Sequence, residues 1–417
     1  MIRPPAKSRP GPATSRCARS GPLSVLLLRK LLPALFALVL IAVPVFAQSE
    51  SSPTPYASMN RDNVAYRGPD RSSAKDLFGN VTTIGILLPL QGARAAQGTA
   101  LQTAAQMALD DEVASATGTT THRLALAFRD ESEHWGQASS EMVQLIDQQQ
   151  AIALITPADG SIAHQAEQIA NKIGIPILTL SSDATTTRIN IPWIFRLGSS
   201  DADQAQLIAT DIYQQRNLRK VFLIAEDDHD GRVGAEEFLR AVNSIHGVPP
   251  ERADFNPATS DLAALGDRLK SMRPDAIVLW AGPEAAATLL PTLQAVPSAV
   301  TYLSSKAAQF SPQPSQPWFS ASLLVPTTDR ALNFAARYRQ QTGLEPTVAA
   351  RHIYDAVRLL AAAVHVAGPN RARVRDYLAS GASYCGVTGA FSFDKAGNLK
   401  GEYVLQSAAE PPIQAAF

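Results

Sequence analysis

The 417-residue chain has only two cysteines, and its first 47 residues contain no acidic side chain. Two cysteines exclude a small disulfide-stapled scaffold, so the fold must rest on a hydrophobic core. The chain is too long for one ordinary core and has room for two α/β domains behind an N-terminal segment.

The acid-free N-terminus carries seven lysines and arginines, followed by the apolar stretch 31–46. With the small residues Val45 and Ala47 at its end, this order is typical of a secretory signal peptide, and we expect cleavage after Ala47. The stretch is shorter than the roughly 20 residues of a membrane-spanning helix and contains two prolines. An uncleaved membrane anchor is the alternative. Gln48 stands where a lipoprotein needs a cysteine.

Positive charge is not in excess once residues 1–47 are removed. The remainder has 30 lysines and arginines against 37 acidic residues, a formal charge of −7. A mildly acidic exported chain is a poor candidate for nucleic-acid binding, and we expect none. Residues 48–80 are polar without an apolar period, which predicts a flexible lead-in.

Strand-like runs alternate with helical patterns through the rest of the chain. The expected strands are 83–90, 123–130, 151–157, 175–180, 220–227, 276–282 and 299–305. The expected helices are 95–111, 137–149, 161–173, 233–245, 262–272 and 284–293. This alternation predicts two parallel sheets covered on both faces, with the second beginning after residues 193–200. The late helical patterns 331–341 and 348–366 have no strands of their own, so the chain must cross between domains more than once.

Catalytic and cofactor motifs are missing: the sequence has no G-x-S-x-G, H-E-x-x-H, P-loop or G-x-G-x-x-G pattern. We therefore predict no enzyme activity, no cofactor and no metal. Residues 226–237 match several positions of a calcium-binding EF-hand loop. They start with glutamate and follow a strand, however, so an acidic loop that opens a helix explains them better.

Two loops with hydroxyl side chains follow neighbouring expected strands. One is TPADGS at 156–161, and the other lies within GIPILTLSSDATTT at 174–187. Ligands of open parallel sheets bind beyond the carboxyl ends of the strands, where helix N-termini supply free N–H groups. These loops are therefore candidates for a binding site, although helix caps and turns would use the same residues.

Seven segments occur in a telling order along the chain: IGILLPLQGARAAQG, LITPADGSIAHQAEQIANKIGIPILTLSS, PWIFRLGSSDADQA, KVFLIAEDDHDGRVGAEEF, DAIVLWAG, YDAVRLLAAAV and GVTGAFSFDKAGNLKGEYVL. Their order and spacing resemble the type I periplasmic binding proteins of the leucine/isoleucine/valine-binding kind, which are substrate-binding components of ABC importers. The resemblance covers about residues 82–408.

The resemblance implies two Rossmann-like lobes with parallel sheets, joined by a three-crossover hinge and closing like a Venus flytrap. Lobe one would comprise 81–196 and 327–388, and lobe two 197–326 and 389–410. It also implies a periplasmic, monomeric, non-catalytic protein that binds a small molecule and docks on an inner-membrane ABC permease. The alternative on the same fold is a regulatory or sensory binding module of the cell envelope.

The family's ligand loops carry over in part. Gly160 and Ser161 match the loop before the third helix, and Ser181 and Ser182, or Thr185 with a gap, match the run after the fourth strand. The resemblance implies that these residues hold the α-carboxylate and ammonium of an amino-acid-like ligand.

The other half of the expected site departs from the family. Gln97 stands where the first loop often has an aromatic residue, and Asp230 replaces a tyrosine. With Trp280, these residues would face the ligand. Lys306 aligns near an acidic residue that often pairs with the ligand's ammonium, which predicts a solute with an added anionic or polar group. The alternative is that Lys306 points to solvent.

Overall fold

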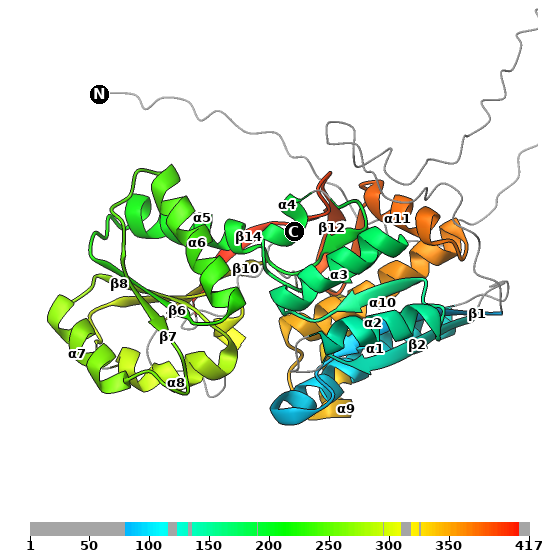
Figure 1. The fold of residues 1–417 in the computed structure, drawn as a ribbon, viewed down its shortest axis with the longest axis horizontal. Coiled ribbons are helices and arrows are strands. Elements are labelled where there is room, and N and C mark those ends of the chain that lie inside the picture. The colour runs from blue at the N-terminus through cyan, green and yellow to red at the C-terminus, as the bar shows by residue number, and fades with distance from the viewer. Residues whose placement is uncertain are drawn as a thin grey trace, which may run out of the picture. The chain divides into compact units, whose positions relative to one another are not determined.

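Two mainly parallel sheets organise the chain in the computed structural model (Figure 1). The structure describes residues 80–115, 123–131, 136–189, 191–294, 296–309, 318–324 and 327–407. The expected signal peptide and all but the last residue of the expected lead-in lie outside the described residues. No helix of the described part is long and apolar enough to cross a membrane.

The first sheet has the order β2-β1-β3-β4-β5, and all of its strands are parallel. Its strands are β1 (Val81–Leu88), β2 (Arg123–Asp130), β3 (Ala153–Thr156), β4 (Ile177–Thr179) and β5 (Ile194–Arg196). The short helices η1 (Gly92–Arg94) and α4 (Thr185–Arg188) follow β1 and β4. We call this sheet and the helices packed on it lobe one.

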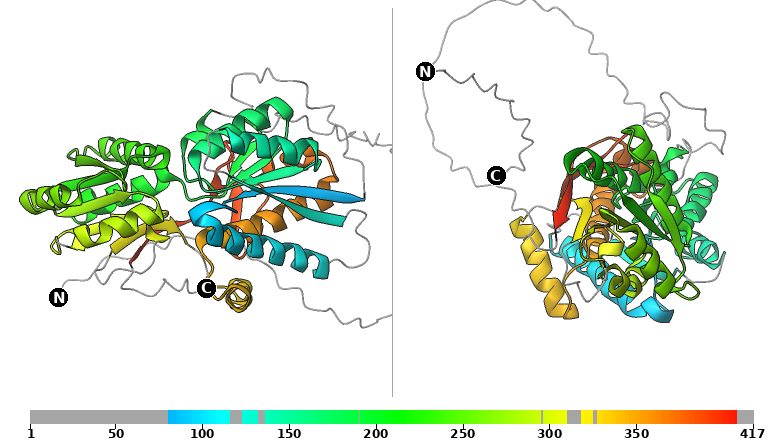
Figure 2. Two further views of the ribbon diagram at one scale, coloured as in Figure 1. Left: turned by 60° about the horizontal axis from the view of Figure 1, so that its bottom comes forward. Right: turned by 90° about the vertical axis from the view of Figure 1, so that its left-hand side faces the viewer.

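Helices cover both faces of the first sheet because its strands alternate side chains between two cores. Ile84 and Ile86 pack in one core with α1 (Ala95–Ser115) and α10 (Val348–Ala367). The intervening Leu87 belongs to the other core. Helices α2 (Gln137–Asp147) and α3 (Gly160–Ile173) supply that second core, on the face opposite α1 and α10 (Figure 2).

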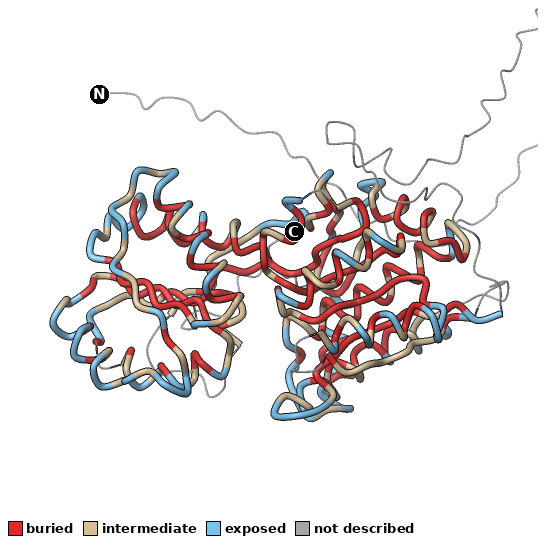
Figure 3. The backbone as a smooth tube through the Cα atoms, viewed as in Figure 1, coloured by how far each residue is buried: buried red, intermediate tan, exposed pale blue. Residues whose placement is uncertain are grey.

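The second sheet has the order β14-β10-β9-β8-β6-β7 and is parallel except for β14. Its strands are β6 (Val221–Glu226), β7 (Glu251–Phe255), β8 (Ala276–Trp280), β9 (Val300–Leu303), β10 (Trp318–Leu323) and β14 (Tyr403–Ser407). We call this sheet and its helices lobe two. Inner strands such as β3, β6 and β8 are buried almost throughout (Figure 3), whereas the edge strands β2, β7 and β14 are mostly half-buried or exposed.

The helices of lobe two also divide between two cores. One core contains α5 (Asp201–Thr210), which continues into the π-helical turn η2 (Asp211–Gln215), and α6 (His229–Ser244). The other core contains α7 (Leu262–Met272) and α8 (Pro283–Gln294), and the 3-10 turn η3 (Ala307–Gln309) packs there through Ala307.

The chain crosses between the sheets three times. It enters lobe two after β5 and returns after β10, because α9 (Asp329–Thr342), α10 and α11 (Arg371–Ala379) all contribute to lobe-one cores. A small antiparallel sheet of β11 (Tyr384–Gly386), β12 (Gly389–Phe393) and β13 (Leu399–Lys400) follows.

The last crossing comes later than the boundary expected at residue 389. The side chains of Phe391, Phe393 and Leu399 pack in the core of lobe one. The chain then joins lobe two through β14, which pairs antiparallel with β10. Residues 389–400 therefore belong with lobe one by their packing.

Candidate functional site

A cavity of about 270 Å³ lies where the carboxyl ends of strands from both sheets meet. We call it the cleft. Lobe one contributes residues that follow β1, β2, β3 and β4, and lobe two contributes residues that follow β6, β8 and β9. Its polar lining residues include Arg94, Gln97, Glu131, Asp159, Ser182 and Ser199, and then Glu226, Asp228, Glu284, Ser305, Lys306 and His352. This is the edge at which open parallel sheets bind ligands.

Helix caps hold two of the acidic loops in place. The Asp159 carboxylate accepts a hydrogen bond from the Ile162 N–H at 2.9 Å and caps α3. Asp228 does the same for α6, accepting from the Gly231 N–H at 2.7 Å. Both carboxylates are therefore fixed at the edge of the cleft by the start of the helix that follows them.

A close backbone approach explains one glycine of the first loop. A Cβ on Gly98 would lie 2.0 Å from the carbonyl oxygen of Pro89. Only glycine lets α1 pack this tightly against the end of β1. Gly98 thus serves the packing of α1 against the end of β1.

Acidic groups outnumber basic ones in the cleft. Its lining has five carboxylates, Glu131, Asp159, Glu226, Asp228 and Glu284, against the two cations Arg94 and Lys306. Both cations already have acidic partners: Arg94 Nη2 lies 2.7 Å from Glu131 Oε1, and Lys306 Nζ lies 2.5 Å from Asp230 Oδ2. The electrostatic environment therefore favours a ligand that brings positive charge.

Three buried polar groups in the cleft have unused hydrogen-bonding capacity. Ser199 Oγ and His352 Nε2 have no hydrogen-bond partner among the described residues, although the two residues are only 4% and 2% exposed. The Glu131 carboxylate, equally buried, contacts Arg94 without a well-aligned hydrogen bond. Buried polar groups are normally paired, so these three groups point to a ligand.

Burial also changes the protonation of two of these groups. It raises the pKa of Glu131 to about 7, despite the opposing effect of Arg94. It lowers the pKa of His352 to about 4, so this imidazole is neutral near pH 7. At neutral pH the cleft thus holds a neutral ring and a carboxyl group near its titration midpoint, which can accept a hydrogen bond from an ammonium group.

The structure places three of the predicted ligand residues, Gln97, Ser182 and Lys306, on the cleft wall. Lys306 does not point simply to solvent, because its ammonium is bound by Asp230. Burial alone would lower the pKa of Lys306, but the Asp230 carboxylate raises it above its usual value. The expectation that Lys306 attracts an added anionic group does not hold as stated, because Asp230 neutralises it.

The other six predicted residues make contacts beside the cleft. Ser161 Oγ donates to Asp159 Oδ1 at 2.6 Å, and Trp280 Nε1 donates to Asp201 Oδ1 at 3.1 Å. Asp230 Oδ1 accepts from the Gly160 N–H at 2.9 Å, which joins lobe two to lobe one.

The remaining two, Ser181 and Thr185, are bound to Asp183. Ser181 Oγ accepts from the Asp183 N–H at 3.1 Å, and the Thr185 hydroxyl donates to Asp183 Oδ1 at 2.7 Å. Both side chains therefore shape the loop that carries Asp183.

The segment 226–237 does not have the form of an EF-hand loop. Strand β6 precedes it, and α6 begins at His229, inside the twelve residues. Glu226 accepts from the Gly282 N–H at 2.6 Å, and Glu237 pairs with Arg188 at 2.6 Å. Its carboxylates point to separate partners, which agrees with an acidic loop that opens a helix.

Sequence reasoning missed Glu131, Ser199 and His352. Glu131 directly follows the strand 123–130, and Ser199 lies in the hinge segment, so both had a positional signal. His352 lies in a helical pattern and is as buried as a packed histidine would be. Only the return of α10 to lobe one brings it to the cleft.

Comparison with known proteins agrees with this architecture. A family model described as periplasmic binding protein matches residues 81–409. The leucine-binding protein LivK of Thermotoga maritima superposes with a TM-score of 0.69 at 18% identity, covering 78% of this chain and 94% of that one. A putative branched-chain amino acid ABC transporter of Rhodospirillum rubrum gives 0.59 at 26% identity, covering 78% and 96%.

Curated relatives match over shorter lengths. Leu/Ile/Val-binding protein homolog 3 of Brucella melitensis is 25% identical over 211 residues, which cover 50% of this chain and 56% of the relative. Glutamate receptor 2.9 of Arabidopsis thaliana is 30% identical over 157 residues, 36% of this chain and 16% of the receptor. The chain thus matches about half of the first protein and about a sixth of the second.

Proposed function

Because the chain belongs to the periplasmic binding protein family, we propose that it traps a small polar, amino-acid-like solute between its two lobes and delivers it to an ABC importer. The observation that carries this proposal is the cleft, in which Glu131, Ser199 and His352 are buried with unused hydrogen-bonding capacity. Its volume of about 270 Å³ is near the lower end of small-molecule sites, roughly 300–1,000 Å³. The proposed role is binding without chemistry.

The charge of the cleft narrows the class of solute. Five carboxylates line it, and Asp230 neutralises Lys306. A solute with at least one ammonium group is therefore favoured over a dianion. Glu131 and Glu226 are our candidates for the ammonium contact, and Arg94 and the Ser199 hydroxyl are candidates for a carboxylate or other acceptor on the same solute.

We assign the residues predicted from sequence to two roles. Gln97, Ser182 and Lys306 are proposed to contact the solute directly, because all three line the cleft. Ser161 supports the wall by holding Asp159. The other predicted residues keep the loops and lobes in position around the cleft.

Residues 1–47 are proposed to direct export to the periplasm and to be cleaved after Ala47, leaving a monomer without a lipid anchor that docks on an inner-membrane permease. The basic, acid-free start and the following apolar stretch support this proposal. The match to a segment of plant glutamate receptors favours one second candidate, a sensory or regulatory binding module on the same fold.

A thermal-shift screen of the purified protein tests the binding role. The panel contains neutral, basic and acidic amino acids, small carboxylates, amides and sugars. A solute at 100 times its Kd should stabilise the protein by about 2.7 kcal/mol. We expect shifts with ammonium-bearing solutes and little effect from dicarboxylates. A flat response to the whole panel would contradict the proposal. If a solute binds, its uptake by cells lacking the gene separates transport, where uptake falls, from sensing, where it does not.

A further inference from the structure

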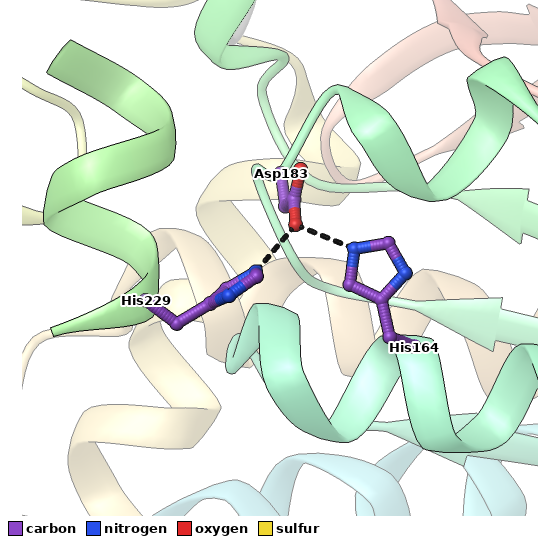
Figure 4. A group of neighbouring side chains, drawn as sticks. All are labelled: His164, Asp183 and His229. Atoms are coloured by element: carbon purple, nitrogen blue, oxygen red, sulfur yellow. Dashed lines mark hydrogen bonds and ion pairs between the residues drawn. The ribbon is translucent and has the colours of Figure 1, made fainter. Parts of the chain in front are cut away.

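Two histidines and an aspartate meet where the lobes touch (Figure 4). His164 lies on α3, and Asp183 lies in the loop after β4, both in lobe one. His229 is the first residue of α6 in lobe two. The Nε2 atoms of His164 and His229 lie 3.0 Å and 2.8 Å from the same oxygen, Asp183 Oδ2. We call these three residues the histidine cluster.

The donor atoms of the histidine cluster are those of a transition-metal site. One ligand atom from each residue lies within 4.8 Å of the other two. Zn²⁺ binds imidazole nitrogen and carboxylate oxygen at about 2.0–2.2 Å, which places tetrahedral ligand atoms roughly 3.3 Å apart. The two nitrogen–oxygen separations of 3.0 and 2.8 Å need to widen by a few tenths of an ångström to admit an ion, and the two imidazole nitrogens, which lie within 4.8 Å of each other, need to reach a similar separation.

A second layer of contacts orients the cluster. His164 Nδ1 faces the buried Glu167 carboxylate at 2.7 Å, so a proton on Nδ1 leaves Nε2 free to bind a metal. Asp183 Oδ1 accepts from both the N–H and the hydroxyl of Thr185 at 2.7 Å. Asp183 therefore presents its other oxygen, Oδ2, to the two rings. Metal-binding histidines usually donate their second N–H to a carboxylate, a backbone carbonyl or water, and the contact of His164 with Glu167 is of this kind.

We propose that His164, Asp183 and His229 bind a divalent transition-metal ion of the Zn²⁺ class, which bridges the two lobes. Three protein ligands leave a fourth position for water. The histidines are 29% and 35% exposed at their side chains, so an ion can reach the site. Imidazole donors disfavour Mg²⁺ and Ca²⁺, which prefer oxygen ligands.

The charge of the surroundings suits either protons or a metal. Hydrogen bonds to Asp183 raise the pKa of both His164 and His229, and Glu167, Asp230 and Arg188 are the other charged groups that act on the cluster. Imidazole binds a metal ion through an unprotonated nitrogen, so an ion competes with protons for the cluster. Metal binding therefore releases protons and weakens as pH falls.

The consequence for the protein is control of closure. Since His229 comes from lobe two and its partners from lobe one, the complete ligand set exists only when the lobes are in contact. An ion in the cluster would hold the closed form from outside the cleft. The proposal is independent of the identity of the solute.

Calorimetry on tag-free protein stripped with a chelator tests the proposal, with Zn²⁺ as titrant and Co²⁺ as a spectroscopic probe. We expect one ion per chain, a tetrahedral Co²⁺ spectrum and a smaller radius of gyration in solution scattering when Zn²⁺ is added. His229→Gln and His164→Gln should each weaken Zn²⁺ binding at least about 100-fold. His246→Asn is the matched control, because His246 is exposed and lies outside the cluster. The Zn²⁺ affinity of this variant should equal that of the wild-type protein.

The cluster would be an ion pair only if Zn²⁺ binding survived His229→Gln unchanged. The same follows if the wild-type protein bound no Zn²⁺ at about 100 µM, a concentration that corresponds to a binding free energy of only about −5.5 kcal/mol. If the variants do not fold, crystals of the wild-type protein soaked in Zn²⁺ give the decision. An anomalous peak among the three side chains supports the site, and its absence overturns it.

Discussion

The cleft and the histidine cluster are built from the same loops but differ in whether their polar groups have hydrogen-bond partners within the chain. In the cluster both nitrogens of His164 and both oxygens of Asp183 have partners within the chain. In the cleft Ser199 Oγ and His352 Nε2 are buried without one among the described residues. The first arrangement joins the lobes by itself, whereas the second leaves polar groups for the solute that we propose.

The two regions also differ in charge, and one ion pair connects them. The cleft has more carboxylates than cations, whereas the cluster has two imidazole rings around the single carboxylate of Asp183. Lys306 lines the cleft, and its partner Asp230 accepts from the Gly160 N–H next to the cluster. Movement of one region should therefore be transmitted to the other, and the following changes test how closely they depend on each other.

The largest effect is expected from Gly160→Ala. A Cβ there would lie 2.5 Å from Asp230 Oδ1 and 2.9 Å from His229 Cδ2, both on lobe two. Overpacking of this kind costs roughly 1–3 kcal/mol, so solute and Zn²⁺ should each bind about 10- to 100-fold more weakly.

Calorimetric Kd values measure this effect. Gly266→Ala is the matched control, since its Cβ would meet only Thr292 at an ordinary 3.5 Å. If Gly160→Ala weakened Zn²⁺ binding alone, the cleft would not depend on closure at the cluster.

Lys306→Met comes next. It leaves the buried Asp230 carboxylate with the Gly160 N–H but without its cation. Loss of one partner of a charge-assisted pair should reduce the free energy of unfolding by roughly 1–3 kcal/mol. Urea unfolding measures the loss, and Lys270→Met, whose pair with Asp267 is exposed, should show none. If the two variants were equally stable, the ion pair of Lys306 with Asp230 would not link the cleft to the histidine cluster.

The smallest effect is a difference in pH dependence. A group whose pKa is higher in the folded than in the unfolded state loses its stabilising contribution as pH rises from the unfolded-state pKa to the folded-state pKa. For the cleft the interval runs from 4.5 to about 7, because burial raises the pKa of Glu131. For the cluster it runs from 6.5 to about 10, because hydrogen bonds to Asp183 and Glu167 raise the pKa of His164.

Thermal unfolding across pH separates the two intervals. Glu131→Gln should flatten the decline in the free energy of unfolding below about pH 7, and His164→Gln should flatten it above that pH, each by at most about 1.4 kcal/mol per pH unit, with Tm following. Identical profiles for the two variants would contradict the assignment of one interval to each region.

Much of the fold could be predicted from sequence because most elements are amphipathic or fully apolar. Strand 123–130 and helix 262–272 match β2 and α7 residue for residue. Strand β7 was missed because it lies at an edge of the sheet, where charged side chains such as Glu251 and Asp254 interrupt the apolar pattern. Helix α4 was missed because one turn is too short to show a period.

The candidate site was harder to predict. The rule that ligands bind beyond the carboxyl ends of the strands indicated the region, and Gln97, Ser182 and Lys306 line the cleft. Glu131 and His352 come from segments more than 200 residues apart, and sequence alone does not show that they share a cavity. The pairing of Lys306 with Asp230 also depends on tertiary contacts, and it is the reason for which we now propose a solute with positive charge.

Isothermal titration calorimetry with L-leucine, L-lysine and L-glutamate, on the wild-type protein and on Glu131→Gln and Ser199→Ala, tests solute binding in the cleft most directly. We expect at least one of the first two to bind with one molecule per chain and more tightly than glutamate. Each substitution should weaken this binding about tenfold or more, the effect of losing roughly 1.4 kcal/mol. Binding of glutamate alone, or an affinity that neither substitution changes, would contradict this expectation.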